Sequence, residues 1–178
     1  RGRIDKRNLH RIPMDRVDIF KATIIKEDKP LDVCLLVDES GSMGGRSIDN
    51  ARRTCISIME ALKDNQMLNL WVMGHTADGW GWHDAPNTTN MTIYHSPRMK
   101  DRPFACGAMD AKCENRDGNA ILAAAKKVGE ESEAPMSNKL MITFSDGSPA
   151  AIGYGGTAGI AHVKKVVNGL ESKGWGVI

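Results

Sequence analysis

Apolar and polar positions divide the chain after residue 30 into alternating strands and helices. Short apolar runs bounded by polar or small residues indicate buried strands, and apolar residues recurring every three or four positions indicate amphipathic helices. Because strands alternate with helices, the pattern predicts an α/β sandwich with a mostly parallel sheet and helices on both faces. Strands are predicted over residues 31–37, 67–73, 91–95, 139–144 and 175–178, and helices over residues 47–62, 118–128 and 157–172.

The segments between these elements are expected to be irregular. Ser47 is predicted to cap the first helix, and residues 20–25 to form a short edge strand. Residues 129–137 look like a polar linker, and residues 148–156, with the Gly-rich stretch 153–159, like a flexible loop. A longer insertion covers residues 96–115, and loops of that length are usually functional or mobile.

Length and charge distribution indicate one domain with an N-terminal extension. Of the 178 residues, the first 30 carry a net charge of +4 and the remainder −2. We therefore predict a basic arm or linker over residues 1–30 and a single domain over residues 31–178. The chain begins at Arg1 and stops within a predicted strand, so we expect a fragment whose domain lacks its last strand and helix. Neither a signal peptide nor an apolar run of about 18 residues occurs, which makes the cytoplasm the expected compartment.

Acidic and hydroxyl residues follow the strongest predicted strands. Asp38, Ser40 and Ser42 come directly after the run Val33–Val37, and Asp146 follows the strand that ends at Phe144. Ligands of open α/β sheets bind at the carboxyl ends of the strands, where these residues would stand. Asp117, just before a predicted helix, can reach the same edge. A cation would relieve the repulsion between three carboxylates, and oxygen ligands suit Mg²⁺ or Mn²⁺.

These motifs also resemble those of a known family. The stretch Val37–Met43 (VDESGSM), together with Phe144–Gly147 (FSDG), is similar to the metal-ion-dependent adhesion site of a von Willebrand factor A domain. The resemblance covers about residues 31–178 and implies a Rossmann-like three-layer sandwich of that type. It also implies that Asp38, Ser40, Ser42 and Asp146 bind Mg²⁺, directly or through water.

The second loop departs from the family pattern. Residues 116–120 (RDGNA) hold no Thr, so Asp117 is the candidate replacement. The opening Gly2–Arg7, the pair Asp117–Gly118 and the turn Ser145–Pro149 resemble the C-terminal domain of the cobaltochelatase CobT subunit and its phage-encoded relatives.

The resemblance to this subunit implies a binding module rather than a catalyst. A partner carboxylate would complete the metal shell, and the domain would work with an AAA+ ATPase subunit and a large chelatase subunit that inserts a metal into a porphyrin-like ring, as in cobalamin synthesis. A ring oligomer is plausible, and neither nucleic acid nor membrane is expected as a partner. No catalytic residues are expected, and the absence of a GxxxxGK[ST] motif argues against ATP binding by that route.

Other functions stay open at this level. The chain could be a generic intracellular or adhesion-type ligand-binding domain of the same family, or a metal-dependent hydrolase. A serine nucleophile with His75 as base lacks the GxSxG motif. A zinc site is disfavoured because Cys106 and Cys113, taken as exposed loop thiols, are too widely spaced, although three histidines accompany them: His75, His83 and His95. Trp80 and Trp82 could form a partner patch or pack on the sheet.

Overall fold

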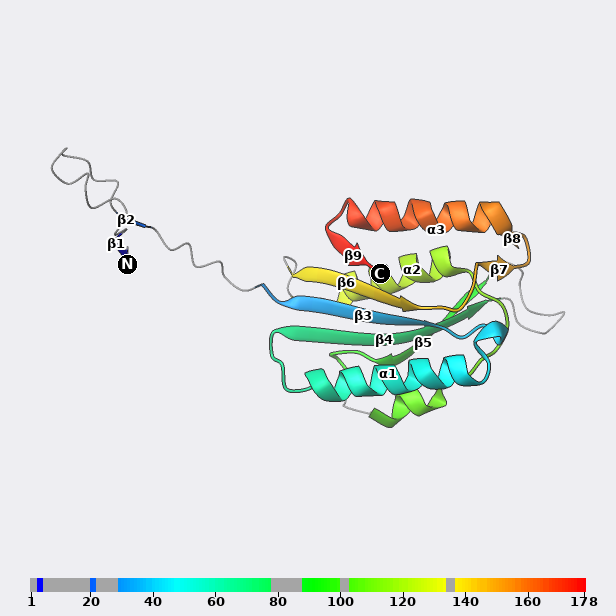
Figure 1. The fold of residues 1–178 in the computed structure, drawn as a ribbon, viewed down its shortest axis with the longest axis horizontal. Coiled ribbons are helices and arrows are strands. Elements are labelled where there is room, and N and C mark those ends of the chain that lie inside the picture. The colour runs from blue at the N-terminus through cyan, green and yellow to red at the C-terminus, as the bar shows by residue number, and fades with distance from the viewer. Residues whose placement is uncertain (1–2, 5–19, 22–28, 78–87, 100–102, 134–136) are drawn as a thin grey trace.

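A computed structural model describes residues 3–4, 20–21, 29–77, 88–99, 103–133 and 137–178 of the chain. In these residues a five-stranded sheet lies between two layers of helices (Figure 1), which confirms the predicted α/β sandwich. The strand order is β5-β4-β3-β6-β9, and all neighbours are parallel except β4 and β5. The strands are β3 (Leu31–Asp38), β4 (Leu68–Ala77), β5 (Thr89–His95), β6 (Asn138–Phe144) and β9 (Trp175–Val177), and the helices are α1 (Arg46–Leu62), α2 (Asp117–Glu131) and α3 (Gly156–Glu171).

Strand β3 occupies the centre of the sheet because its apolar run can be buried on both faces. It pairs in parallel with β4 on one side and β6 on the other. Leu35 and Val37 belong to the core cluster beneath α1, whereas Cys34 and Leu36 belong to the cluster beneath α2 and α3. Since parallel strands end at one edge of a sheet, the loops that follow β3 and β6 meet there.

Helix α1 covers one face of the sheet, and α2 and α3 cover the other (Figure 1). The buried residues of α1 are Ile48, Ala51, Cys55 and Met59, which confirms the stripe predicted from their spacing. Full burial of a side chain the size of Ile or Met contributes about 1.5–3 kcal/mol, so this stripe fixes α1 on the sheet. The helix thereby holds the loop after β3 between its own N-terminus and the strand end.

Two helix boundaries differ from the prediction. Helix α1 begins at Arg46 with Gly45 as its N-cap, and no side chain caps it, so the predicted role of Ser47 is wrong. Gly45 has a φ of 77°, a conformation that residues with a Cβ rarely adopt. Helix α2 also includes residues 129–131 of the predicted linker. Glu131 stabilises this last turn, since it accepts a hydrogen bond from the Trp71 indole N–H and pairs with Lys127.

Segments predicted as irregular contain short regular elements. The insertion holds a 3-10 helix, η3 (Pro103–Ala108), and the Gly-rich region holds a hairpin of β7 (Ala150–Ala151) and β8 (Tyr154–Gly155). Residues 156–159 already belong to α3. In the predicted edge strand 20–25, β2 (Phe20–Lys21) pairs with β1 (Arg3–Ile4) in a separate two-stranded sheet, and residues 22–25 lie outside the described part.

Cys106 is buried, which corrects the prediction of two exposed thiols. Helix η3 packs against α1 and places Cys106 and Met109 in the core beneath it, with the Cys106 Sγ 3.4 Å from the Met59 Sδ. Burial raises the pKa of the Cys106 thiol to about 11, so it stays protonated at neutral pH. Cys113 is half-buried, and neither thiol forms a disulfide. Cys106 and Met109 of the inserted segment therefore belong to the core, whereas Phe104 of the same segment is exposed.

Candidate metal centre

The loop after β3 brings the first three predicted ligands together. Asp38 ends the strand with its side chain fully buried, and its Oδ1 accepts a hydrogen bond from the backbone N–H of Ser40 at 2.8 Å. The chain then turns through the 3-10 helix η2 (Gly41–Met43). This turn places the hydroxyls of Ser40 and Ser42 3.0 Å apart. A carboxylate and two hydroxyls thus converge within five residues.

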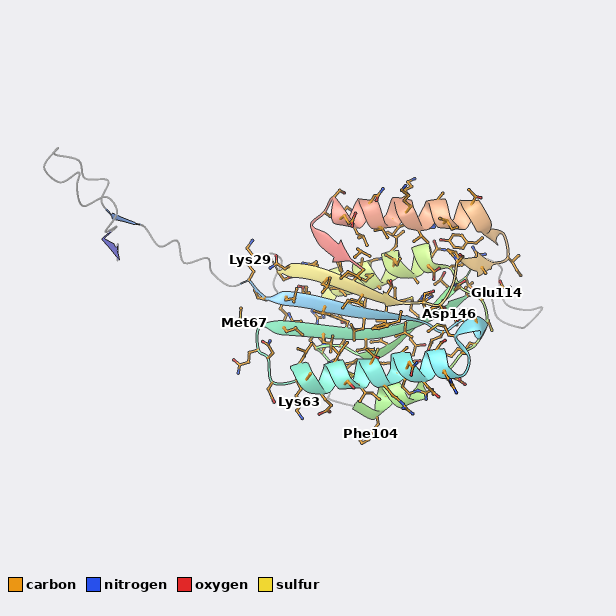
Figure 2. All side chains as sticks on the ribbon, in the orientation of Figure 1. Lys29, Lys63, Met67, Phe104, Glu114 and Asp146 are labelled. Atoms are coloured by element: carbon orange, nitrogen blue, oxygen red, sulfur yellow. The ribbon has the colours of Figure 1, made fainter. Side chains whose placement is uncertain are left out.

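Asp146 joins this group from the loop after β6. The Ser42 hydroxyl donates a hydrogen bond to Asp146 Oδ1 at 2.8 Å, although the two residues are 104 positions apart. Figure 2 places Asp146 beside η2, at the edge where β3 and β6 both end. The meeting of the two loops follows from the parallel pairing of their strands. The structure therefore brings Asp38, Ser40, Ser42 and Asp146 into one hydrogen-bonded set.

A third loop connects Asp117 to the set through Asn115. The Asn115 Nδ2 donates to Asp38 Oδ2 at 3.0 Å and lies 3.3 and 3.4 Å from the two oxygens of Asp117. The Asn115 Oδ1 accepts from the Ala150 N–H at 2.6 Å, and this contact fixes which end of the amide faces the carboxylates. Asp117 is therefore near Asp38, but an amide donor stands between them.

Two residues of this arrangement were not predicted from the sequence. Asn115 is one, and Ser145, whose hydroxyl donates to Asp38 Oδ2 at 3.0 Å, is the other. With the Ser40 N–H, three donors thus hold the Asp38 carboxylate. Ser145 lies within the FSDG motif and could have been suspected. Asn115 could not, because its role depends on a loop distant in sequence.

His75 and Asp117 have shifted pKa values. Burial is the main cause that raises the pKa of Asp117 to about 6, and the negative charge of Asp38 adds to it, whereas the Asn115 hydrogen bond opposes it. Burial also lowers the pKa of His75, against the opposing charges of Asp38 and Glu39. The His75 Nε2 lies 3.6 Å from Asp117 Oδ1. His75 is thus neutral at pH 7, and its Nδ1 has no hydrogen-bond partner, so it is not bonded to either serine as a catalytic base would be.

The donor atoms fit a small hard cation. Oxygens at adjacent corners of an Mg²⁺ octahedron lie about 2.9 Å apart when the bonds are about 2.0–2.1 Å. The Ser40–Ser42 and Ser42–Asp146 oxygen distances of 3.0 and 2.8 Å are compatible with this spacing and are also those of ordinary hydrogen bonds. In the described ranges no three His, Cys, Asp or Glu side chains group to hold a metal, so a site here depends on the serine hydroxyls. His83, Trp80 and Trp82, which the sequence raised as candidates, lie outside these ranges.

An ion pair between the buried Glu39 and the exposed Lys112 stabilises the loop that carries the serines. The Glu39 carboxylate is fully buried, accepts a hydrogen bond from the Tyr94 hydroxyl and pairs with Lys112 Nζ at 2.8 Å. The backbone N–H of Lys112 also donates to the Glu39 carbonyl at 2.7 Å, and that of Gly41 to the Cys113 carbonyl at 2.7 Å. The segment after η3 is thereby fastened to the loop that carries Ser40 and Ser42.

We expect Asn115→Ala to weaken binding of Mg²⁺ and Mn²⁺ by about 10-fold to 100-fold, the range typical of residues that orient metal ligands. The variant removes a donor from Asp38 and the link between Asp38 and Asp117. Titration calorimetry measures the affinities. Asn90→Ala, at an exposed position of β5, is the matched control and should bind as the parent does. An unchanged affinity in Asn115→Ala would show that the amide does not position the carboxylate.

Known proteins that resemble this chain in sequence or structure indicate its fold. No family model matches the chain. The uncharacterized protein YojO of Bacillus subtilis (strain 168) is 36% identical over 125 residues, which cover 67% of this chain and 18% of YojO. The pilus adhesin SpaC from Lactobacillus rhamnosus GG, in its open conformation, matches with a TM-score of 0.53 and 19% identity over 70% of this chain and 15% of SpaC. A mutant of the PilB minor pilin from Streptococcus sanguinis matches with a TM-score of 0.51 and 10% identity over 73% of this chain and 33% of PilB.

The fold is von Willebrand A-like. At these identities the structural matches establish the fold alone, and the chain spans a third or less of the length of each of these proteins. None of the matched names mentions a metal ion or a chelatase. In the described residues no helix has the length and apolar character needed to cross a membrane.

Proposed function

We propose that this von Willebrand A-like domain is a protein-binding module that uses Mg²⁺ or Mn²⁺ to hold a carboxylate of its partner. The observation that carries the proposal is the continuous set of oxygens from Ser40 through Ser42 to Asp146, at the spacing of an octahedral shell and next to the buried Asp38. A bound divalent ion with an open coordination position would supply an acceptor for an anionic oxygen.

Each residue has a distinct part in this proposal. Asp38 provides the negative charge, and its three donors keep the carboxylate in one orientation. The hydroxyls of Ser40 and Ser42 act as neutral ligands, and Asp146 completes the protein side of the site directly or through water. Asp38 and Asp146 together balance the two charges of the ion, so an anionic group from outside would bind at the open coordination position by replacing water.

Asp117 remains the fifth predicted ligand, and its contacts suggest a supporting part. Both of its oxygens lie near the Asn115 amide, and one faces His75. In this position Asp117 can orient Asn115, which in turn orients Asp38. If Asp117 bound the ion directly, its contact with the amide would have to be exchanged for one with the metal.

Binding to a partner protein is a broader proposed function than that of a cobaltochelatase subunit, which the sequence suggested. That narrower function depends on short motifs near Gly2, Asp117 and Ser145, and the comparisons add nothing to it. The solved neighbours SpaC and PilB are an adhesin and a minor pilin, so a role in binding a protein or surface ligand agrees better with them. An AAA+ ATPase subunit as partner and a cytoplasmic location are proposed only as part of the narrower cobaltochelatase function.

Proton relaxation of water with Mn²⁺ as the probe tests the proposal. Mn²⁺ bound to the chain should keep exchangeable waters and enhance the relaxation rate, and Ser42→Ala should weaken this binding. Acetate should then lower the enhancement as its carboxylate replaces water, whereas the neutral analogue acetamide should not. The proposal fails if Mn²⁺ does not bind, or if acetate and acetamide act alike.

A further inference from the structure

A cavity of about 530 Å³ lies on the α2 and α3 side of the sheet, next to the candidate metal centre. Its volume falls in the range of about 300–1,000 Å³ that is typical of small-molecule sites. The apolar part of its wall comes from β3, α2 and α3, and consists mainly of Leu36, Ile121, Ile160, Val163 and Val167. Ile160 is half exposed, so solvent reaches the cavity on the side of α3.

Polar side chains line the same cavity, among them His75, which is 3% exposed, and Asp117. The His75 Nε2 lies 3.6 Å from the Asp117 Oδ1, whereas its Nδ1 is enclosed. A molecule in the cavity would therefore meet the Asp117 carboxylate rather than the His75 Nδ1. A carboxylate in a largely apolar wall is stabilised by a hydrogen-bond donor that enters the cavity.

We propose that this cavity binds a small organic molecule that has a compact apolar body and an amine or hydroxyl group as hydrogen-bond donor. The apolar body would pack between α2 and α3, and the donor would reach the Asp117 carboxylate. The negative charge of Asp117 favours a cationic amine over an anion. Lys164 also lines the wall, but it is exposed and lies on α3. This site goes beyond the proposed protein-binding function and does not depend on a bound metal.

Three compounds of nearly the same shape test this inference. Tryptamine, tryptophol and indole-3-propionate share an indole ring and a two-carbon chain, and end in an amine, a hydroxyl and a carboxylate. Protein NMR titrations of the full chain, in EDTA so that no carboxylate binds through a metal, should give affinities that fall in that order. Tryptamine should bind at least about 10-fold more tightly than indole-3-propionate, with shifts at residues that line the cavity. Absence of tryptamine binding at millimolar concentration, or equal affinity for all three, would overturn the proposal.

Matched variants locate the binding. Val163→Trp fills the cavity from α3 and should abolish tryptamine binding, whereas Lys165→Trp places the same side chain at an exposed neighbouring position that does not line it. NMR spectra show whether each variant is folded. Asp117→Asn keeps the shape of the side chain and removes its charge, so it should reduce the preference for tryptamine over indole-3-propionate. Binding that survives Val163→Trp, or an unchanged preference in Asp117→Asn, would contradict the assignment.

Discussion

Asp38→Asn is expected to weaken Mg²⁺ binding by more than about 100-fold while the chain stays folded. The structure makes Asn a better test than Ala, because the Asp38 side chain is fully buried and accepts hydrogen bonds from three donors. Truncation to Ala would leave all three unpaired, at about 1–3 kcal/mol each, and would confuse folding with binding. Asn keeps the volume and removes the charge. Its oxygen can take the place of Oδ2 and accept from Asn115 and Ser145, so only the Ser40 N–H loses its acceptor. A residue that merely orients a ligand typically costs 10–100-fold, so loss of the charged ligand itself should exceed that range.

Titration calorimetry with Mg²⁺ and Mn²⁺ measures this effect, and circular dichroism checks the fold. Asp49→Asn is the matched control, since Asp49 is half exposed on α1 and pairs with Arg52. It should bind both ions as the parent chain does. Parent-like affinity in Asp38→Asn would exclude Asp38 as a ligand and, with it, the proposed site. Loss of binding in both variants would indicate a general charge effect rather than coordination.

The parts of the fold that were predictable are those encoded by local pattern. Strand β3 is a continuous apolar run, and α1 has a regular stripe, so both follow from short stretches of sequence. The ligand motif was visible for the same reason, since Asp38, Ser40 and Ser42 occupy one loop. Asp146 could be added because a parallel sheet brings the ends of neighbouring strands together. That the four would meet was therefore a consequence of topology rather than of any contact read from the sequence.

The parts that were missed depend on partners distant in sequence. The sequence pattern did not single out Glu39, yet it is fully buried, because Tyr94 of β5 and Lys112 satisfy its carboxylate. Asp32 at the opposite end of β3 is similar, since it accepts hydrogen bonds from Ser132 and Ser137 on either side of residues 134–136. A buried charge is tolerated only when it is paired, and periodicity does not reveal the pair.

The antiparallel strand β5 and the burial of Cys106 have the same explanation. Alternation of strands and helices predicted a mostly parallel sheet, which is confirmed, but it did not indicate which strand would be the exception. No helix separates β4 from β5 among the described residues, and these two strands pair antiparallel. Cys106 stands in a polar stretch whose fold is set by packing against α1. In both cases tertiary contacts determined the structure of the segment. Its local sequence had predicted a loop or had left the direction of the strand open.

Gly74→Ala is expected to lower the free energy of unfolding by about 3 kcal/mol or more, through the buried Glu39. A Cβ added at Gly74 would lie 2.6 Å from the Glu39 Cδ and 2.7 Å from its Oε2. The carboxylate cannot rotate freely away, since it is enclosed and bound to Tyr94 and Lys112. Moving it would break one of these contacts and leave the buried carboxylate short of a partner, at about 1–3 kcal/mol or more for a charged group, and the overpacking itself adds about 1–3 kcal/mol. Urea denaturation followed by circular dichroism measures the change.

A glycine without such a neighbour supplies the control. Gly169 lies within α3, and a Cβ there would meet nothing within 4 Å. Gly169→Ala should therefore raise the stability by about 0.5–1 kcal/mol, because Ala has the higher helix propensity. The cause of the Gly74 effect can be isolated with Glu39→Asp, whose shorter side chain withdraws from the added methyl group. If the clash is responsible, Gly74→Ala should cost about 1–3 kcal/mol less in the Glu39→Asp background than in the parent, a coupling typical of residues in contact. An equal cost in both backgrounds would place the strain elsewhere in β4.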